Sequence, residues 1–401
     1  KYSLFFRISI NNVQQRMIIV MIFILNMYRE IKIDHTMNEV SDVNVVRIDP
    51  IIKPLQLIKQ LGVTDENHSF VSESRKTIKN ILDGKDKRLL VISGPCSIHD
   101  KDMAIEYGKF IREQQKKYQD SLFIIMRVYF QKARSSNKWQ GLIYDPDLNG
   151  TCKINKGLRV SREILLELSK LKVPIGTEFL DTIIPQYITD LVSWGQLGPK
   201  TVESHVHRQL ASGLSMPVAF SNSTDGNVDV SMNSMYSASL AHIFPGTNTD
   251  GFISTVETKG NKYCHLLLRG GSIGISSNDL TRMTYLRKKK HHPNYYPETI
   301  KKYTKLLKDR SLMNAIIVDC SHGNSKMTYT KQIDVAKSIC KQFKDENTSI
   351  KGVMIESNLK DGNQELKTRK ELVYGVSITD GCLGMKGTIE LFDVFKDGIK
   401  D

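Results

Sequence analysis

The 401-residue sequence lacks an apolar run long enough to cross a membrane. A spanning helix needs roughly 20 apolar residues, and the wholly apolar stretch at residues 17–25 falls far short of that length. The stretch resembles the core of a signal peptide, but no small-residue cleavage site follows it. Because the chain also begins with Lys1, we predict an upstream extension of the reading frame, non-native or disordered, over residues 1–40. The natural start would then lie near Met27 or Met37. No membrane partner is predicted.

Cysteine is also scarce, with 6 residues in the whole chain at irregular spacings and without a CxxC pair. A disulfide framework is typical of short secreted chains with many regularly placed cysteines. The pattern therefore favours a reducing compartment, and we predict a cytoplasmic protein.

Acidic residues are outnumbered, since 57 Lys and Arg face 43 Asp and Glu. Such an excess is typical either of a polyanionic partner or of anionic small substrates. The one compact basic run, residues 287–290 followed by His291 and His292, contains no aromatic residues and no known nucleic-acid motif. We therefore predict no nucleic-acid partner.

From about residue 88, short β-branched runs alternate with longer amphipathic stretches, which is typical of βα units on a parallel sheet. Eight such runs occur, at residues 89–93, 123–128, 174–178, 191–195, 217–220, 265–268, 315–318 and 352–355. Eight units predict an α/β fold of the (β/α)8 TIM-barrel type over residues 88–401. Residues 41–87, with a helix at 72–82, are predicted to form an N-terminal regulatory or oligomerisation appendage. Residues 231–263 are predicted to form an extra β-hairpin between the fifth and sixth strands.

Chemically active residues recur at or just after these runs. In a TIM barrel the active site is built at the carboxyl ends of the strands. Taken singly, a buried cysteine, histidine or arginine is more often structural than functional. Chance is a poor explanation for nine of them at strand ends or in the closing loop: Cys96, Arg127, Glu178, Lys200, Ser221, Arg269, His322, Glu356 and Asp380.

Four of these residues form a mixed sulfur, nitrogen and oxygen ligand set, namely Cys96, His322, Glu356 and Asp380. Two carboxylates argue against a closed structural zinc site, which normally uses Cys and His alone. We predict an open catalytic site for a divalent ion, Mn, Fe, Co or Zn, that polarises a substrate carbonyl. The remaining cations, Arg127, Lys132, Arg134, Lys200 and Arg269, are suited to binding two phosphates and a carboxylate.

Several longer runs carry a specific resemblance: GPCSIHD at 94–100, MRVYF with KxR at 126–134, EFLD at 178–181, ESxVHRxLASGLS at 203–215, LRGG at 268–271, SHGNS at 321–325 and SITD at 377–380. Together they resemble the class I (microbial and fungal type I) 3-deoxy-7-phosphoheptulonate synthases, and the similarity extends from about residue 41 to 395. Members of that family condense phosphoenolpyruvate with erythrose 4-phosphate in aromatic amino-acid biosynthesis.

The resemblance implies roles for individual residues. The metal would lie at Cys96, His322, Glu356 and Asp380. Phosphoenolpyruvate would lie against Arg127, Lys132, Lys200 and Arg269, with Glu178, Ser221 and Asp380 also at the substrates. The phosphate of erythrose 4-phosphate would lie against Arg134 and Ser135. Catalysis is expected to depend on Lys132, Arg127 and His322, with Lys132 protonating the developing alkoxide.

The chain departs from the family pattern mainly on the phosphoenolpyruvate side. The usual EKPRT run has Gln131 and Ala133 in place of Glu and Pro, Lys200 replaces a usual Arg, and Ser221 replaces a usual Lys. About twenty residues are also inserted after Gly271. Because the metal ligands are retained, a second hypothesis is a catalytically weak paralogue that acts as a regulatory or assembly partner.

Family members are commonly inhibited by an aromatic amino acid, and many are homodimers or homotetramers, so the resemblance predicts both properties here. The effector cavity would include Pro185, Gln186, Ser215 and Gly246. A small residue at position 246 favours the tyrosine-regulated kind, because a missing side chain leaves room for the extra hydroxyl.

Overall fold

The computed structural model describes residues 40–134, 138–274, 289–343 and 348–400. Residues 1–39, which include most of the predicted extension and the apolar stretch, lie outside the described residues, as does Ser135. The chain divides into residues 1–50 and a unit spanning Ile51–Asp401. Among the described residues, no helix has the length and apolar character needed to span a membrane.

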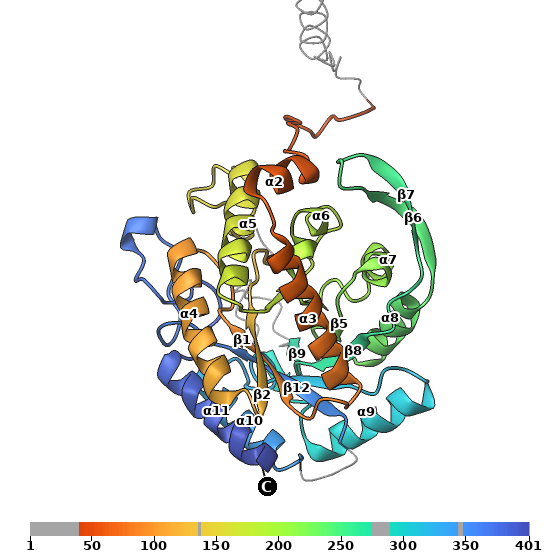
Figure 1. The fold of residues 1–401 in the computed structure, drawn as a ribbon, viewed down its shortest axis with the longest axis vertical. Helices are drawn as coiled ribbons and strands as arrows, with labels where there is room; N and C mark the ends of the chain where they lie inside the picture. Colours follow the sequence, from red (N-terminus) through yellow and green to blue (C-terminus); the bar gives the residue numbers. More distant parts are fainter. Residues whose placement is uncertain (1–39, 135–137, 275–288, 344–347, 401) are drawn as a thin grey trace, which may run out of the picture. The chain divides into compact units, whose positions relative to one another are not determined.

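Eight parallel strands close into a barrel in the order β1-β12-β11-β8-β5-β4-β3-β2 (Figure 1). Their bounds are β1 Leu89–Gly94, β2 Leu122–Arg127, β3 Ile175–Glu178, β4 Trp194–Leu197, β5 Val218–Ser221, β8 Cys264–Leu268, β11 Ile316–Asp319 and β12 Ile350–Glu356. The predicted TIM barrel is therefore confirmed.

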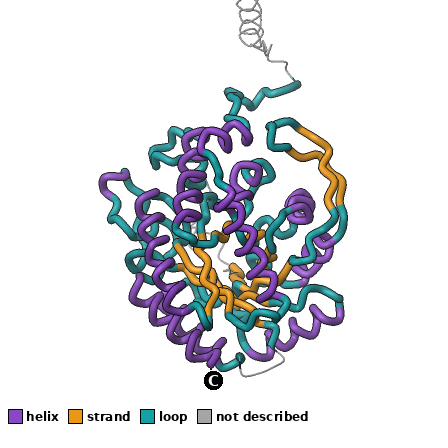
Figure 2. The backbone as a smooth tube through the Cα atoms, viewed as in Figure 1, coloured by secondary structure: helices purple, strands orange, loops and turns teal. Residues whose placement is uncertain are grey.

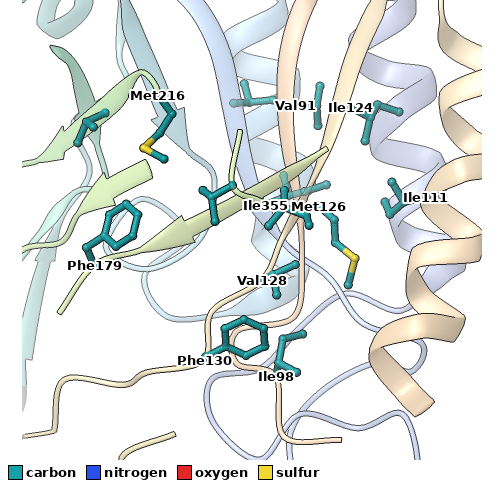
Figure 3. Packing of buried hydrophobic residues seen from close by; sticks show 14 of the residues in the cluster. Val91, Ile98, Ile111, Ile124, Met126, Val128, Phe130, Phe179, Met216 and Ile355 are labelled. Atoms are coloured by element: carbon teal, nitrogen blue, oxygen red, sulfur yellow. The ribbon is translucent and has the colours of Figure 1, made fainter. Parts of the chain in front are cut away.

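Helices surround the barrel in the described unit, and the tube view shows them outside the strands (Figure 2). The α-helices are α2 Pro54–Leu61, α3 Asp65–Leu82, α4 Lys101–Tyr118, α5 Ile154–Lys170, α6 Pro185–Ile188, α7 His205–Gly213, α8 Asp229–Ser239, α9 Pro297–Asp309, α10 Gln332–Cys340 and α11 Met385–Lys400. The described residues also form three short 3-10 helices, η1 Thr189–Leu191, η2 Tyr329–Lys331 and η3 Arg369–Glu371. The outer strand faces pack on these helices, as Val91, Ile124 and Met126 do near Ile111 of α4 (Figure 3).

The opposite faces of the strands fill the barrel interior. Leu90 and Ile92 of β1 belong to a buried cluster that also contains Ile78, Ile81 and Leu82 from the end of α3. Because β1 begins at Leu89, the end of α3 covers the amino-terminal end of the barrel. The carboxyl ends of the strands are therefore left to build the site.

Two predicted elements differ from the structure. The fourth strand begins at Trp194 rather than at residue 191, because Thr189–Leu191 form the 3-10 helix η1. The predicted hairpin begins later, at β6 His242–Thr247 paired with β7 Ile253–Thr258. The residues before it form α8, whose buried side chains recur at helical spacing: Ser231, Met232, Ser234, Met235 and Ala238.

A buried histidine inside the barrel predicts a pH effect on stability. Trp194 Nε1 can only donate, so it donates to His265 Nε2 at 3.0 Å, and His265 Nδ1 then donates to the Tyr263 carbonyl oxygen at 3.0 Å. The first contact requires the neutral ring, because Nε2 accepts a hydrogen bond only when it carries no proton. Burial accordingly lowers the pKa of His265 to about 4.

We expect the free energy of unfolding to fall by roughly 3 kcal/mol as pH drops from 6.5 to 4, because only the unfolded histidine binds a proton in that window. His265→Gln should remove that part of the slope when denaturant unfolding is measured across the pH range. Part of the slope should remain, since burial also lowers the pKa of His99 to about 4. His205→Gln, at an exposed position of α7, is the control. An unchanged slope in His265→Gln would contradict this assignment.

Candidate metal and substrate site

Three potential ligands meet at the carboxyl end of the barrel. Cys96 follows β1, Glu356 ends β12, and Asp380 lies in the loop before α11. One ligand atom from each lies within 4.8 Å of the other two. Cys96 and Glu356 are buried. Parallel strands therefore bring together three residues that are far apart in the sequence.

The fourth predicted ligand, His322, lies at the edge of this cluster. Its Nε2 is 3.5 Å from Glu356 Oε1, but the histidine is not part of the group whose atoms all lie within 4.8 Å. Its backbone has a φ of 53°, in the left-handed region that non-glycine residues seldom adopt. Such conformations are held in place by surrounding structure and cluster at functional sites.

The donor set fits a divalent transition metal. Glu356 Oε1 is buried and accepts no hydrogen bond within the described part of the chain, although Arg127 Nη2 lies 3.1 Å away. Burial, followed by the nearby Glu356 carboxylate, raises the pKa of the Cys96 thiol to about 12. A metal ion binds the thiolate and displaces that proton, so metal binding at this thiol would release a proton.

Lys132 and Arg127 lie directly against this cluster. Lys132 Nζ is 3.1 Å from Cys96 Sγ and 3.2 Å from the Cys96 carbonyl oxygen. Burial opposes its charge, but the Cys96 sulfur, Asp380 and Glu356 together raise the pKa of Lys132. Burial likewise opposes the charge of Asp380, and Lys132 and His322 lower the pKa of that carboxyl below its usual range. Lys132 therefore carries a proton beside the ligand cluster.

Arg127 is held by several neighbours, although its buried Nε has no hydrogen-bond partner among the described residues. Its Nη1 donates to the carbonyl oxygens of Pro95 at 2.5 Å and Cys96 at 2.8 Å. Its guanidinium carbon lies 3.7 Å from the centroid of the Tyr129 ring. Tyr129 in turn donates to Gln196 Oε1. The guanidinium is therefore preorganised before a substrate binds.

Two other predicted cations lie close to the cluster. The charge of Arg269 acts on both Asp319 and His322. Arg134 donates to the Trp139 carbonyl oxygen at 3.2 Å, and its charge acts on Asp380. Both cations therefore act electrostatically on the candidate metal site.

The remaining predicted substrate residues lie at other strand ends. Lys200 donates to the Ala133 carbonyl oxygen at 2.7 Å, which places it beside the loop that carries Lys132. Glu178 ends β3 and lies so close to Gly198 that a Cβ there would be 1.8 Å from its Oε1. Ser221 is fully buried at the end of β5, and its hydroxyl donates to the Asn222 carbonyl oxygen at 3.1 Å. No hydrogen bond among the described residues joins the Ser221 hydroxyl to the metal cluster.

Sequence reasoning missed three supporting residues. Asp319 ends β11 and contacts His322, Tyr129 stacks on Arg127, and Asp181 accepts a hydrogen bond from Gln131 Nε2. A glutamate at 131 would place a second carboxylate beside Asp181, so the amide found here suits its neighbour. The position of Asp319 at a strand end was the one signal that could have revealed it.

Comparisons with known proteins agree with this geometry. The sequence matches the model of the DAHP synthetase I family over residues 63–293 and 272–392. The chain belongs to the DAHP synthetase I family. A relative from Buchnera aphidicola subsp. Schizaphis graminum, named "Phospho-2-dehydro-3-deoxyheptonate aldolase, Trp-sensitive", is 41% identical over 90% of this chain and 99% of its own length. The protein of the same name from Escherichia coli K12 is 40% identical over 89% and 97%.

A solved structure supports the same conclusion. The "Phospho-2-dehydro-3-deoxyheptonate aldolase" from Francisella tularensis SCHU S4 superposes with a TM-score of 0.82 at 41% identity, covering 89% of this chain and 99% of that one. The two matches to the DAHP synthetase I model overlap at 272–293. The predicted insertion lies in this region.

The described residues after Arg269 include a two-stranded ribbon, β9 Gly271–Gly274 paired antiparallel with β10 Lys289–His292. The backbone N–H of Ser272 donates to the Thr224 carbonyl oxygen at 2.9 Å, which ties the ribbon to the loop after β5. Residues 275–288, including Arg287, lie outside the described residues.

Proposed function

We propose that this chain condenses phosphoenolpyruvate with erythrose 4-phosphate and water, giving 3-deoxy-D-arabino-heptulosonate 7-phosphate and phosphate. This reaction is the first step of the shikimate pathway. One observation carries the proposal. At the carboxyl end of a barrel that belongs to the DAHP synthetase I family, potential metal ligands lie together with cationic side chains. Two anionic substrates repel each other, and these cations offset that repulsion.

In this reaction a bound divalent ion would supply Lewis-acid polarisation of the aldehyde. Cys96, His322, Glu356 and Asp380 would hold it. Its identity, Mn, Fe, Co or Zn, remains a prediction. The mixed donor set suits several first-row metals.

The chain's own groups account for binding and proton transfer. Arg127, Lys200 and Arg269 would bind phosphoenolpyruvate, while Arg134 and Ser135 would bind the erythrose 4-phosphate phosphate. As C3 of phosphoenolpyruvate attacks the aldehyde carbon, Lys132 would donate its proton to the developing alkoxide. Water then adds at C2 and phosphate leaves by C–O cleavage. The contacts of Lys132 Nζ with Cys96 support this role, because the ammonium lies next to the cluster.

A phosphate-release assay tests this proposal against the weak-paralogue alternative. Purified protein is mixed with phosphoenolpyruvate, erythrose 4-phosphate and Mn²⁺, and each component is omitted in turn. The proposal expects release that requires both substrates and the metal. A folded, metal-loaded protein without release would favour the regulatory partner.

Two departures predict a measurable effect on phosphoenolpyruvate. Ser221 and Lys200 stand where the family has Lys and Arg, and one charge-assisted hydrogen bond contributes roughly 1.5 to 3 kcal/mol. The loss of one lowers efficiency by about one to two orders of magnitude. The double variant Ser221→Lys, Lys200→Arg should therefore raise kcat/KM for phosphoenolpyruvate far more than for erythrose 4-phosphate.

Steady-state kinetics with each substrate varied in turn provide the measurement. Each single variant separates the two contributions, and thermal unfolding tests whether buried position 221 accepts the longer side chain. Equal phosphoenolpyruvate constants in wild type and a folded double variant would show that neighbouring cations already supply the charge.

We further propose inhibition by an aromatic amino acid and a homodimeric or homotetrameric assembly. Ser215 and Val256 line a surface cavity of about 860 Å³. A Cβ at Gly246 would lie 2.8 Å from Val256 Cγ2, which is too close for an ordinary contact. Glycine at this position therefore allows the present position of the Val256 side chain. Pro185 and Gln186, in α6, and Gly246 also belong to the predicted effector set, but of the four only Ser215 lines this cavity.

Tyrosine is the effector that the glycine predicts, whereas the relatives are named Trp-sensitive. Titrating activity with tyrosine, tryptophan and phenylalanine distinguishes them. Inhibition by tryptophan or phenylalanine alone would overturn the tyrosine assignment. Light scattering of the same sample tests the assembly, and a monomer would contradict it.

A further inference from the structure

The carboxylate of Asp319 contacts the predicted ligand His322, although Asp319 itself is not one of the predicted ligands. It ends β11 and is buried. Its Oδ2 lies 2.6 Å from Nδ1 of His322. Its Oδ1 accepts from the Ser321 backbone N–H at 2.9 Å and from the Ser321 hydroxyl at 2.7 Å. Both oxygens therefore have defined partners, and one of them faces the imidazole.

This arrangement determines which ring nitrogen of His322 carries the proton. An ionised carboxylate can only accept, so Nδ1 must donate to it. The Ser321 hydroxyl, 2.8 Å from the same nitrogen, gives its own proton to Asp319 and can there act only as an acceptor. In the neutral ring Nε2 therefore carries the lone pair, on the side of the ring that faces Glu356 Oε1 at 3.5 Å.

The backbone at His322 is irregular, so the strand alone does not fix the orientation of the imidazole ring. His322 follows the strand by three residues and adopts a φ of 53°, and Lys326 and Met327 in the same loop also have positive φ. Among the described residues, the imidazole is hydrogen-bonded through Nδ1, to Asp319 and Ser321. These contacts fix the orientation of a ligand carried on an irregular loop.

We propose that Asp319 is a positioning residue that holds His322 in the Nδ1–H tautomer, with Nε2 directed at the divalent ion. The proposal rests on the proposed metal-dependent function. A carboxylate behind a ligating histidine fixes its tautomer and orientation, and loss of such a partner typically lowers metal affinity or activity by 10- to 100-fold. The positive charge of Arg269, a proposed phosphoenolpyruvate ligand, also acts on this carboxylate. Asp319 therefore interacts with both a substrate-binding residue and a metal-binding residue.

Asp319→Asn is the sharpest variant because the surroundings dictate how the amide sits. The Ser321 backbone N–H requires an oxygen at the Oδ1 position. The amide NH2 must then face His322 Nδ1, where it can only donate. The imidazole proton would move to Nε2, the nitrogen needed by the metal. A change of one atom therefore reverses the tautomer while preserving the shape of the side chain.

Two readouts other than activity test the proposal. In metal-free wild type, at a pH high enough to leave the His322 ring neutral, ¹⁵N NMR of labelled histidine should show the Nδ1–H form of His322, assigned by its loss in His322→Gln. In Asp319→Asn it should show the Nε2–H form, and the dissociation constant for Mn²⁺, from competition with a chromophoric chelator, should rise 10- to 100-fold. Asp190→Asn is the control for loss of a carboxylate, because Asp190 pairs with the buried Arg162 outside the site.

The possible failures are separable. Nε2–H in wild type, or unchanged Mn²⁺ affinity in a folded Asp319→Asn variant, would overturn the role of Asp319. If that variant does not fold, the wild-type spectrum alone still decides. Wild type that shows the Nδ1–H form but binds no divalent ion would instead overturn the proposed metal-dependent function.

Discussion

Cys96→Ala should abolish tight binding of the divalent ion and reduce turnover by at least roughly a thousandfold. Lewis-acid stabilisation contributes several kcal/mol to the transition state, and about 1.4 kcal/mol corresponds to a factor of ten in rate. Cys96 supplies the only sulfur in the ligand group that the described residues form. The barrel should remain folded, because Cys96 lies in the loop after β1 and pairs with no strand.

Metal content by mass spectrometry and phosphate release measure this effect. Cys264→Ala is the matched control, since it removes another buried thiol at the start of β8, the opposite end of the barrel. This variant also loses one buried sulfur atom, but it leaves Cys96, Glu356 and Asp380 unchanged. Full metal content in purified Cys96→Ala would refute the assignment of Cys96 as a ligand.

Arg127→Met should weaken both stability and phosphoenolpyruvate use. The Arg127 and Glu356 side chains are each 2% exposed, with Nη2 and Oε1 3.1 Å apart. Removing one partner of a buried ion pair costs about 3 to 5 kcal/mol, because the other charge is left uncompensated. A divalent ion also offsets the charge of Glu356, so the loss should be largest in metal-free protein and partly recovered on adding Mn²⁺.

The same variant should lower kcat/KM for phosphoenolpyruvate by roughly ten- to a hundredfold for each charge-assisted hydrogen bond lost. Arg162→Met provides the comparison, since Arg162 is equally buried but pairs with Asp190 outside the site. It should lose stability without the rescue by Mn²⁺. Equal responses of the two variants to Mn²⁺ would contradict the link between Arg127 and the metal site.

Much of the fold could be predicted because barrel strands have a strong local pattern. The β1 run, Leu89 to Gly94, is buried throughout, as strands covered on both faces must be. Short apolar runs are ambiguous, however. The fourth strand was predicted to begin at residue 191, but residues 189–191 form a 3-10 helix and the strand begins at Trp194. Residues 231–239 were also assigned to the hairpin, although their buried positions follow a helical period.

The candidate site could be predicted in position more readily than in detail. The barrel rule places residues such as Cys96 and Glu356 at one end, and the structure brings those two together with Asp380. Side-chain partners depend on loop conformations that local pattern does not encode. The positive φ of His322 and its contact with Asp319 are properties of this kind. The Gln131–Asp181 pair likewise joins loops from two different strands.

Anomalous diffraction from crystals grown with Zn²⁺ tests the central claim most directly. The account predicts a strong peak at the carboxyl end of the barrel, about 2.3 Å from Cys96 Sγ and about 2.0 to 2.2 Å from His322 Nε2 and from carboxylate oxygens of Glu356 and Asp380. Small movements of His322 toward the other three ligands would accompany it. A structure with no peak there, or with the metal held by other residues, would contradict the account.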